Sequence, residues 1–291
     1  MMFNTGEELL KITEENGLKI SEVVLACECE YTGLTHEDIR NKMNETLEIM
    51  KKSAQAGLEK EIKSVGGIIG GDAKKVFDYT NKGKTLCGQN INKAIARAYS
   101  CAEVNAGMGQ ICAAPTAGSC GIIPASVLTA AEIYKSSDND IIDALLTASG
   151  IGMIISKNAT VSGAEGGCQA ECGSAAAMAS AAIVELAGGT PEMSLHAAAI
   201  AIKNIMGLIC DPVAGLVEAP CAKRNASGTV NALICADMVL AGVRSIIPFD
   251  EVIDAMYRVG RMLPFELKET ALGGVAATPT GIEISNRIFN K

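Results

Sequence analysis

Tryptophan is absent from this 291-residue chain, and aromatic side chains make up only 3% of it. Hydrophobic residues still account for 48% of the sequence, so the core must be filled by Ala, Ile, Leu, Val and Met. Together with 30 glycines, this composition favours helices packed closely over small side chains. The chain is long enough to bury a substantial core, in one large domain or two small ones.

Basic residues are in deficit, with 25 Lys and Arg against 33 Asp and Glu and a net charge of −8. This argues against a nucleic-acid-binding surface, which needs a basic stripe, and against an anionic membrane face. No secretory signal is expected, because residues 1–16 lack an apolar segment and are rich in Glu. Eleven cysteines without an export signal predict a reducing compartment, where thiols act as ligands or core residues. We therefore expect a cytoplasmic protein.

Strand signals are missing as well, because no sustained alternation of apolar and polar residues is bounded by turns. Thr5 and Glu8 form a capping box before a helix at 6–16, and Thr35 caps a helix whose apolar residues recur every three or four positions until Gly57. The sequence predicts an all-α fold with short Gly/Cys-rich loops. Further helices are expected up to about residue 29, at 89–105, 138–155, 173–187 and 190–208, from after Asn225 to about 247, and at 250–263.

Two stretches interrupt this helical pattern. The uncharged run from Val104 to Ala131 is long enough to span a bilayer, but its Asn, Gln, Pro and Gly residues indicate a buried loop between helices. The glycines at 66–71 form a flexible break, and phosphate binding there is disfavoured because no strand precedes them and no Gly-Lys-Ser/Thr follows. We expect an N-terminal helical segment at 1–65, a candidate for packing on a partner, and a helical catalytic domain at 66–291; one continuous domain is the alternative.

Three thiols lie at turn-like breaks in the second half of the chain. Cys168, Cys210 and Cys221 stand beside glycine, proline or acidic residues, 42 and then 11 positions apart. Thiolates are soft donors that favour zinc or an iron-sulfur cluster over magnesium or calcium. The spacing matches neither a zinc finger nor a ferredoxin, so burial of these thiols as small hydrophobes stays equally open. Cys172 lies one helical turn after Cys168, and by geometry either thiol could be the ligand.

Several polar residues stand near these breaks. Thr116, Gly118 and Ser119 precede a helix with Pro124 in its first turn, where free N–H groups could bind an anion; a buried turn is the alternative. Further polar pairs precede the first thiol break and follow the last: Lys157 with Asn158, and Arg224 with Asn225. The only two histidines, His36 and His196, lie in predicted helices and are expected to be structural.

Longer motifs enclose these residues. They include the segments Ala113-Ala114-Pro115-Thr116-Ala117-Gly118-Ser119-Cys120-Gly121, Lys157-Asn158-Ala159, Ser162-Gly163-Ala164-Glu165, Gly167-Cys168-Gln169, Cys210-Asp211-Pro212-Val213-Ala214-Gly215 and Arg224-Asn225. From about residue 85 to the C-terminus, this pattern closely resembles the iron-sulfur-dependent L-serine dehydratases, and in particular the alpha subunit of the two-chain form.

The resemblance implies a cofactor and a reaction. Cys168, Cys210 and Cys221 would hold a 4Fe-4S cluster whose open iron acts as a Lewis acid, so that L-serine yields pyruvate and ammonia without pyridoxal phosphate. Oxygen sensitivity and a role in amino-acid degradation and gluconeogenesis follow from the same likeness. Cys120 does not occupy a ligand position of this family. The expected substrate-binding residues are Thr116, Gly118, Ser119, Lys157, Asn158, Arg224 and Asn225.

The resemblance also implies that the catalytic base lies on another chain. The catalytic base of the family is the histidine of a Ser-His-Thr motif, which two-chain members carry on the beta subunit. This chain has no Ser-His or His-Thr pair, so a beta subunit is the expected partner. Two other functions remain in view: a related L-cysteine desulfidase, and a non-enzymatic metal- or redox-binding module.

Overall fold

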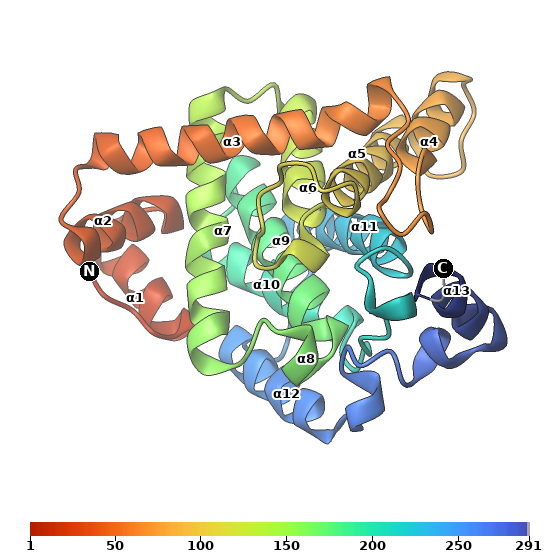
Figure 1. Ribbon diagram of the computed structural model, residues 1–291. Coiled ribbons are helices and arrows are strands. Elements are labelled where there is room, and N and C mark those ends of the chain that lie inside the picture. Colours follow the sequence, from red (N-terminus) through yellow and green to blue (C-terminus); the bar gives the residue numbers. More distant parts are fainter. Residues whose placement is uncertain (290–291) are drawn as a thin grey trace.

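The computed structural model describes residues 1–289, and it consists of helices joined by short loops (Figure 1). No strand occurs in these residues; the only sheet-like pairings are isolated bridges between Lys63 and Gly70 and between Cys210 and Lys268. The prediction of an all-α fold is confirmed. The α-helices are α1 Gly6–Asn16, α2 Ile20–Thr32, α3 His36–Glu59, α4 Asp72–Asn81, α5 Gly88–Ala106, α6 Ile122–Tyr134, α7 Asp138–Asn158, α8 Gly163–Gly166, α9 Ser174–Leu186, α10 Pro191–Asn204, α11 Cys221–Leu240, α12 Phe249–Met262 and α13 Pro279–Phe289.

Helix α9 lies at the centre, packed against α6, α7, α10 and α11 (Figure 1). Eleven of its 13 residues are buried, and six of those eleven are alanines. Side chains this small let four neighbouring helices approach the α9 backbone closely, as dense interior packing requires. The expectation of a core built from small aliphatic residues is confirmed at this helix.

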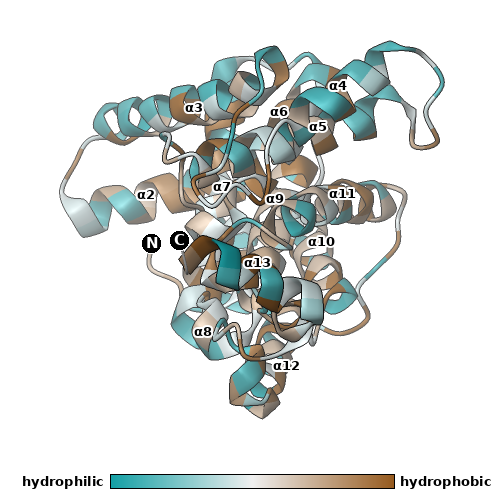
Figure 2. Cartoon of the chain, turned by 45° about the vertical axis from the view of Figure 1, so that its right-hand side comes forward, coloured by the Kyte–Doolittle hydropathy of each residue, from teal (hydrophilic) through white to brown (hydrophobic). Residues whose placement is uncertain are grey.

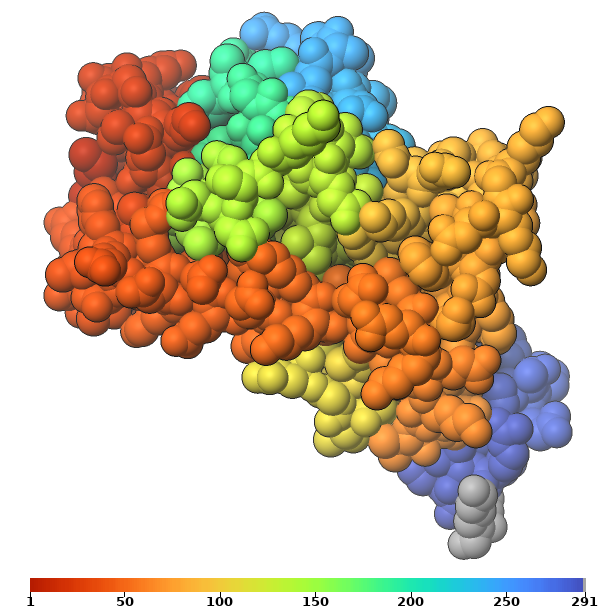
Figure 3. Space-filling view, turned by 90° about the horizontal axis from the view of Figure 1, so that it is seen from above, coloured from red at the N-terminus to blue at the C-terminus, as the bar shows by residue number. Residues whose placement is uncertain are grey.

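The N-terminal helices share this core. Phe3, Leu9 and Ile20 are buried in the same hydrophobic core as Ile151 of α7. Thr5 caps α1 by accepting from the Glu8 backbone, and the Asp250 carboxylate at the start of α12 accepts from two further N–H groups of that first turn. Helix α3 runs along one face of the molecule and turns a hydrophilic side outward (Figures 2 and 3). The proposed division at residue 65 stays a prediction.

Some helix boundaries differ from expectation. Helix α11 begins at Cys221 and ends at Leu240, so Arg224 and Asn225 lie in its first turns instead of before it, and the expected extension to 247 is wrong. Helix α10 likewise stops at Asn204, before the expected residue 208. Apolar residues continue past both ends, and a uniformly apolar run carries no periodic signal of where a helix stops.

The uncharged run at 104–131 is only partly a loop. Helix α5 extends to Ala106, a 3-10 turn covers Ala117–Ser119, and α6 starts at Ile122. Windows at 117–134 and 138–158 are long and apolar enough to cross a membrane, but 67% and 61% of them are buried inside the protein. Their apolar side chains already pack against other helices. The C-terminal helix α13 was not predicted, and it packs beside the 3-10 turn Val213–Gly215.

Candidate active site

Three segments that are far apart in the sequence meet beside the start of α9. They are the 3-10 turn Ala117–Ser119, the π-helical turn Gln169–Gly173, and the first turns of α11. A π turn inside a helical run is uncommon and often marks a functional site. Here the irregular turn follows Cys168 directly, so this thiol is presented at the junction of the three segments.

The three predicted ligand thiols come together at this junction. Cys168 Sγ lies 3.4 Å from Cys172 Sγ, Cys210 Sγ lies 3.8 Å from Glu171 Oε2, and the Cys168 charge acts on Cys210 and Cys221. Polar contacts with Cys172 and Cys210 hold the pKa of Cys168 well below its usual range, with help from the charge of Arg224. The same contacts raise the pKa of Cys172 and Cys210, whereas burial raises that of Cys221 to about 12. Within this group, Cys168 is the thiol that most readily becomes a thiolate.

Cys172 remains close to Cys168. Its Sγ atom lies 3.4 Å from the Cys168 Sγ atom, as their one-turn separation requires. Geometry does not distinguish the two thiols as ligands, so the assignment of Cys168 stays with the resemblance.

A buried ion pair fixes the loop after Cys210. Arg224 Nη2 lies 2.7 Å from Asp211 Oδ1, and Asp211 is only 1% exposed. Arg224 Nη1 also donates to the Ile209 carbonyl at 2.9 Å, while Asp211 Oδ2 accepts from the Val275 backbone at 2.7 Å. The contact with Oδ1 is an ion pair without hydrogen-bond geometry, and the added hydrogen bonds of Arg224 Nη1 and Asp211 Oδ2 help to offset desolvation of the two charges. The guanidinium is thereby held beside the thiols.

Glu171 is a second buried carboxylate, which the sequence analysis missed. It is 9% exposed, its Oε1 accepts from Thr116 Oγ1 at 2.8 Å, and its Oε2 lies 3.8 Å from Cys210 Sγ. Burial raises the pKa of Glu171 to about 7, against the opposing effect of the Thr116 hydrogen bond. One sequence signal could have revealed it: Glu171 is the only charged residue between Glu165 and Glu185. A lone charge in a buried run needs a partner or a function.

Most of the predicted substrate-binding residues surround this junction. Thr116 donates to Glu171, and the buried Ser119 hydroxyl lies 3.3 Å from that of Thr116. Asn225 Nδ2 donates to the Gly118 carbonyl at 2.7 Å, and its Oδ1 accepts from the Gly121 backbone at 2.8 Å. Asn225 therefore occupies one of the free N–H groups at the start of α6, where an anion site was considered.

The other two predicted residues lie elsewhere. Lys157 Nζ donates to the Phe3 carbonyl and to Asn4 Oδ1, both at 3.1 Å, and Asn158 Nδ2 donates to the Asn4 carbonyl at 2.7 Å. In this structure the pair fastens the chain ahead of α1 to the end of α7.

The glycine-rich loop at 66–71 binds an anion of the protein itself, the Glu218 carboxylate. The Glu218 carboxylate accepts from Ser64 Oγ at 2.6 Å, from the Gly66 backbone at 2.8 Å and from the Ile68 backbone at 3.0 Å. A Cβ atom at Gly66 would lie 2.6 Å from Glu218 Oε1, so the close approach requires glycine. This contact, the Glu218 latch, fixes the chain three residues before Cys221.

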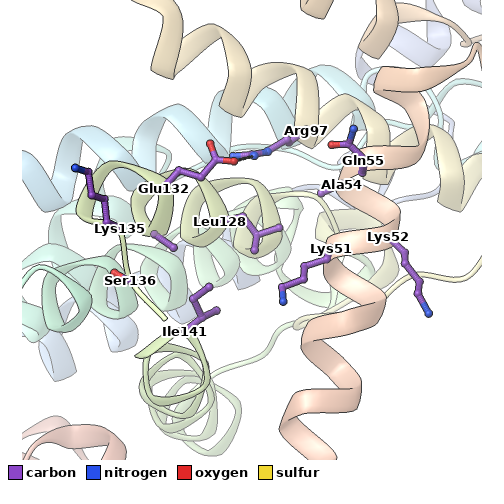
Figure 4. A pocket seen from close by; sticks show the side chains of 11 residues that line it. Lys51, Lys52, Ala54, Gln55, Arg97, Leu128, Glu132, Lys135, Ser136 and Ile141 are labelled. Atoms are coloured by element: carbon purple, nitrogen blue, oxygen red, sulfur yellow. Dashed lines mark hydrogen bonds and ion pairs between the residues drawn. The ribbon is translucent and has the colours of Figure 1, made fainter. Parts of the chain in front are cut away.

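A cavity elsewhere is the main competing site. It has a volume of about 650 Å³ and lies between α3, α5, α6 and the start of α7 (Figure 4). Its basic side chains are already partnered at two points: Lys51 donates to Asp138 at 2.8 Å, and Arg97 pairs with Glu132. The cavity contains no thiol and no carboxylate without a cation. The junction of the thiols is therefore the stronger candidate for catalysis.

Within residues 1–289, no three His, Cys, Asp or Glu side chains converge closely enough to hold a single metal ion. A cofactor with several irons needs its protein ligands further apart than one ion does. The donor set of three free thiols, Cys168, Cys210 and Cys221, suits such a soft-metal group.

Comparison with known proteins supplies the context for this site. The family model described as serine dehydratase alpha chain matches residues 15–276. The chain belongs to the serine dehydratase alpha chain family. A probable L-serine dehydratase alpha chain of Bacillus subtilis is 52% identical over 288 residues, covering 99% of this chain and 96% of the relative. The L-serine dehydratase alpha chain of Peptoniphilus asaccharolyticus is 50% identical, with 97% of each chain covered.

Longer members of the serine dehydratase family contain the same region. An L-serine dehydratase of Streptomyces coelicolor is 37% identical over 282 residues, which cover 94% of this chain but only 60% of the relative. In that relative, a further part of about two fifths of its length lies outside the match. The alpha chain family thus corresponds to one portion of a larger polypeptide in other members.

Proposed function

We propose that this chain is the alpha subunit of an L-serine dehydratase, a lyase that converts L-serine to pyruvate and ammonia. The observation that carries the proposal is the junction of Cys168, Cys210 and Cys221 with the Arg224 guanidinium and the Glu171 carboxylate. Near-complete matches to relatives named L-serine dehydratase alpha chain support the same activity.

The three thiols would hold a 4Fe-4S cluster in the working enzyme. When bound, such a group supplies a Lewis acid that assists departure of the substrate hydroxyl. Glycines beside the thiols suit this role because they allow close approach of the chain. A Cβ atom at Gly163, for example, would lie 3.1 Å from Cys210 Sγ.

The remaining side chains bind and orient the substrate. Arg224, fixed by Asp211, supplies a positive charge for a carboxylate, and Thr116 and Ser119 supply hydroxyl groups. Asn225 holds the Gly118 carbonyl and the start of α6 in place beside them. Lys157 and Asn158, which contact the segment ahead of α1 in this chain, complete the substrate-binding set that we propose.

A partner subunit completes this active site in our proposal. Neither histidine of the chain is placed to act as the base: His36 is exposed at the start of α3, and His196 lies 3.6 Å from Glu192 within α10. The alpha chain names of the relatives imply a second chain, and the longer Streptomyces relative has room for one in the same polypeptide. A beta subunit would supply the proton acceptor. The complete enzyme would degrade serine in the cytoplasm and provide pyruvate for gluconeogenesis.

The test is an anaerobic reconstitution of the chain with iron, sulfide and its beta partner. We expect pyruvate from L-serine with the complete enzyme, very little with the chain alone, and loss of activity in air. A base contributes roughly 10²–10⁴-fold to such a step. Replacing Cys168, Cys210 or Cys221 by Ala should abolish iron-sulfide uptake, whereas Cys172→Ala should retain it.

Three results would contradict the proposal. Faster elimination from L-cysteine than from L-serine would identify a desulfidase. Zinc without sulfide would indicate a metal-binding module. Full activity of the chain alone would place the base within this subunit.

A further inference from the structure

Glu171 has acceptor capacity that the protein does not use. An ionised carboxylate offers about four lone-pair sites to hydrogen-bond donors. In the structure one oxygen accepts from Thr116 Oγ1 at 2.8 Å, and the other has only the Cys210 thiol, at the longer distance of 3.8 Å. A carboxylate that is 9% exposed obtains little compensation from water. Its second oxygen is therefore available to a strong donor.

No protein cation faces this carboxylate. None of the ion pairs in residues 1–289 includes Glu171, although every other buried or half-buried acidic group at the junction has strong donors: Asp211 has Arg224, and Glu218 has its backbone N–H groups. The groups that contact its two oxygens are the Thr116 hydroxyl and the Cys210 thiol, and neither is a cation. Such a position favours an incoming cation over an incoming anion.

Two glycines pack closely against this carboxylate. A Cβ atom at Gly163 would lie 2.6 Å from Glu171 Oε2, and one at Gly118 would lie 3.0 Å from Oε1. Any larger residue at 163 would push against the carboxylate from the side on which Cys210 lies. The two glycines therefore let the carboxylate sit close to the backbone beside Thr116 and the Cys210 thiol.

We propose that Glu171 binds the α-ammonium group of the amino-acid substrate and so selects amino acids over the corresponding hydroxy acids. The inference rests on the proposed function, because the substrate class comes from it. L-serine carries one cation, one anion and one hydroxyl. Arg224 and the hydroxyls of Thr116 and Ser119 suit the latter two groups, and Glu171 is the acceptor at the junction that suits the ammonium group.

The experiment compares L-serine with L-glycerate, which carries a hydroxyl in place of the α-amino group. Binding of each is measured by calorimetry on the anaerobically loaded alpha chain with its beta partner, beside KM and kcat for pyruvate formation. Glu171→Gln should weaken L-serine binding about tenfold or more, as loss of a charge-assisted hydrogen bond predicts. Its affinity for L-glycerate should change less than about threefold, because that ligand lacks the ammonium group. Glu171→Asp should restore part of the serine affinity.

Two controls separate direct contact from other effects. Glu269→Gln removes a nearby negative charge that lies on an exposed residue, and it should leave both affinities within about twofold. Iron and sulfide content should be the same in all variants, which shows that cofactor assembly is intact.

Three results would overturn the assignment. Unchanged serine affinity in Glu171→Gln would show that the carboxylate does not meet the ammonium group. Equal weakening of serine and glycerate would indicate a structural role. A lower kcat with unchanged serine binding would place Glu171 in the chemical step instead. If the wild-type enzyme bound both ligands but formed no pyruvate, the proposed function would be wrong, and this result is distinct from the three that concern Glu171.

Discussion

Two buried carboxylates lie within the same set of thiol-bearing turns, and their surroundings differ sharply. Glu218, which is 3% exposed, accepts from the Ser64 hydroxyl and from the backbone of Gly66, Ile68 and Ile69. Glu171 accepts from one hydroxyl and has a thiol beside its other oxygen. The first carboxylate is saturated by the protein, and the second is not.

This difference separates a structural group from a binding group. A carboxylate that satisfies several backbone donors holds those donors in place, so its removal leaves them buried and unpaired. An undersatisfied carboxylate adds little to folding but remains open to a ligand. Counting donors around each buried acid therefore indicates which one stabilises the fold and which one meets the substrate.

The largest effect is expected at the Glu218 latch. Glu218→Ala leaves the N–H groups of Gly66 and Ile68 without their acceptor, whereas Ser64 and Ile69 keep the hydrogen bonds between them. The loss should cost about 3 kcal/mol or more, since each unsatisfied buried group costs about 1–3 kcal/mol. Urea denaturation of wild type, Glu218→Ala and Glu171→Gln measures the difference. Glu171→Gln should cost less than about 1 kcal/mol, because its carboxylate satisfies a single donor. Equal losses of unfolding free energy in the two variants would show that the two carboxylates do not differ in structural role.

The Arg224–Asp211 pair provides the next test, because it combines both roles. Arg224→Met leaves Asp211 buried without its cation and should cost about 3 kcal/mol of stability, in addition to weakening serine binding. Adding Asp211→Asn should recover part of the stability but none of the binding. A double-mutant cycle of denaturation midpoints and KM values measures both. Recovery of binding in the double variant would mean that Arg224 only fastens the loop.

A smaller effect is expected at Gly163, which packs against Glu171. In Gly163→Ala, the new methyl group would meet Glu171 Oε2 at 2.6 Å and Cys210 Sγ at 3.1 Å, and overpacking of this kind costs about 1–3 kcal/mol. Because the carboxylate must move, the KM for serine should rise; iron content is measured in the same samples, since Cys210 is crowded as well. Gly173→Ala is the matched control, since its methyl group would find ordinary contacts beginning at 3.5 Å. Similar kinetics in the two variants would argue against a role for the position of Glu171.

The smallest effect concerns Glu185, a half-buried acid. It accepts from Thr147 Oγ1 at 2.7 Å and from the Ser21 backbone at 3.3 Å, but its Oε1 atom has no partner. Burial raises the pKa of Glu185 above its unfolded value, so its contribution to stability is present below the unfolded pKa and is lost as pH rises through the folded one.

Glu185→Gln should therefore stabilise the protein by about 1 kcal/mol near pH 8, where the charge is otherwise buried. The gain should disappear towards pH 4, where the carboxyl group is protonated in both states. Thermal denaturation at a series of pH values checks the sign. A gain that is constant with pH would show that burial of the charge is not its cause.

Periodic and capping signals predicted much of the fold. Thr5, Thr35 and Thr190 all cap helices as expected, because a hydroxyl that accepts from the third following N–H is a local contact. Helix ends inside uniformly apolar sequence were not predictable in this way. Whether α10 stops at Asn204 depends on Asn231 and Cys235, which contact the Asn204 side chain from another helix.

The motifs brought the turns of the junction to attention, and the substrate-binding roles of their residues stay predictions. Cys168, Cys210, Thr116 and Arg224 meet at one junction, whereas Lys157 contacts the N-terminal segment. Glu171 and the partner of the 66–71 loop were missed because each depends on a contact between distant segments. Glu218 and Ser64 are 154 positions apart, and no local pattern records such a pairing.

The fixed points of the loop that begins at Cys210 have a consequence for biosynthesis. The Cys210 backbone pairs with Leu267 and Glu269, and Asp211 accepts from Val275, so the loop depends on a segment that follows it by more than 50 positions. The three thiols precede these anchors in the chain, and until the anchors are synthesised the Cys210 loop lacks the contacts that hold it. The cofactor that we propose would therefore find its site fixed only after the segment that carries Leu267, Glu269 and Val275 has been made.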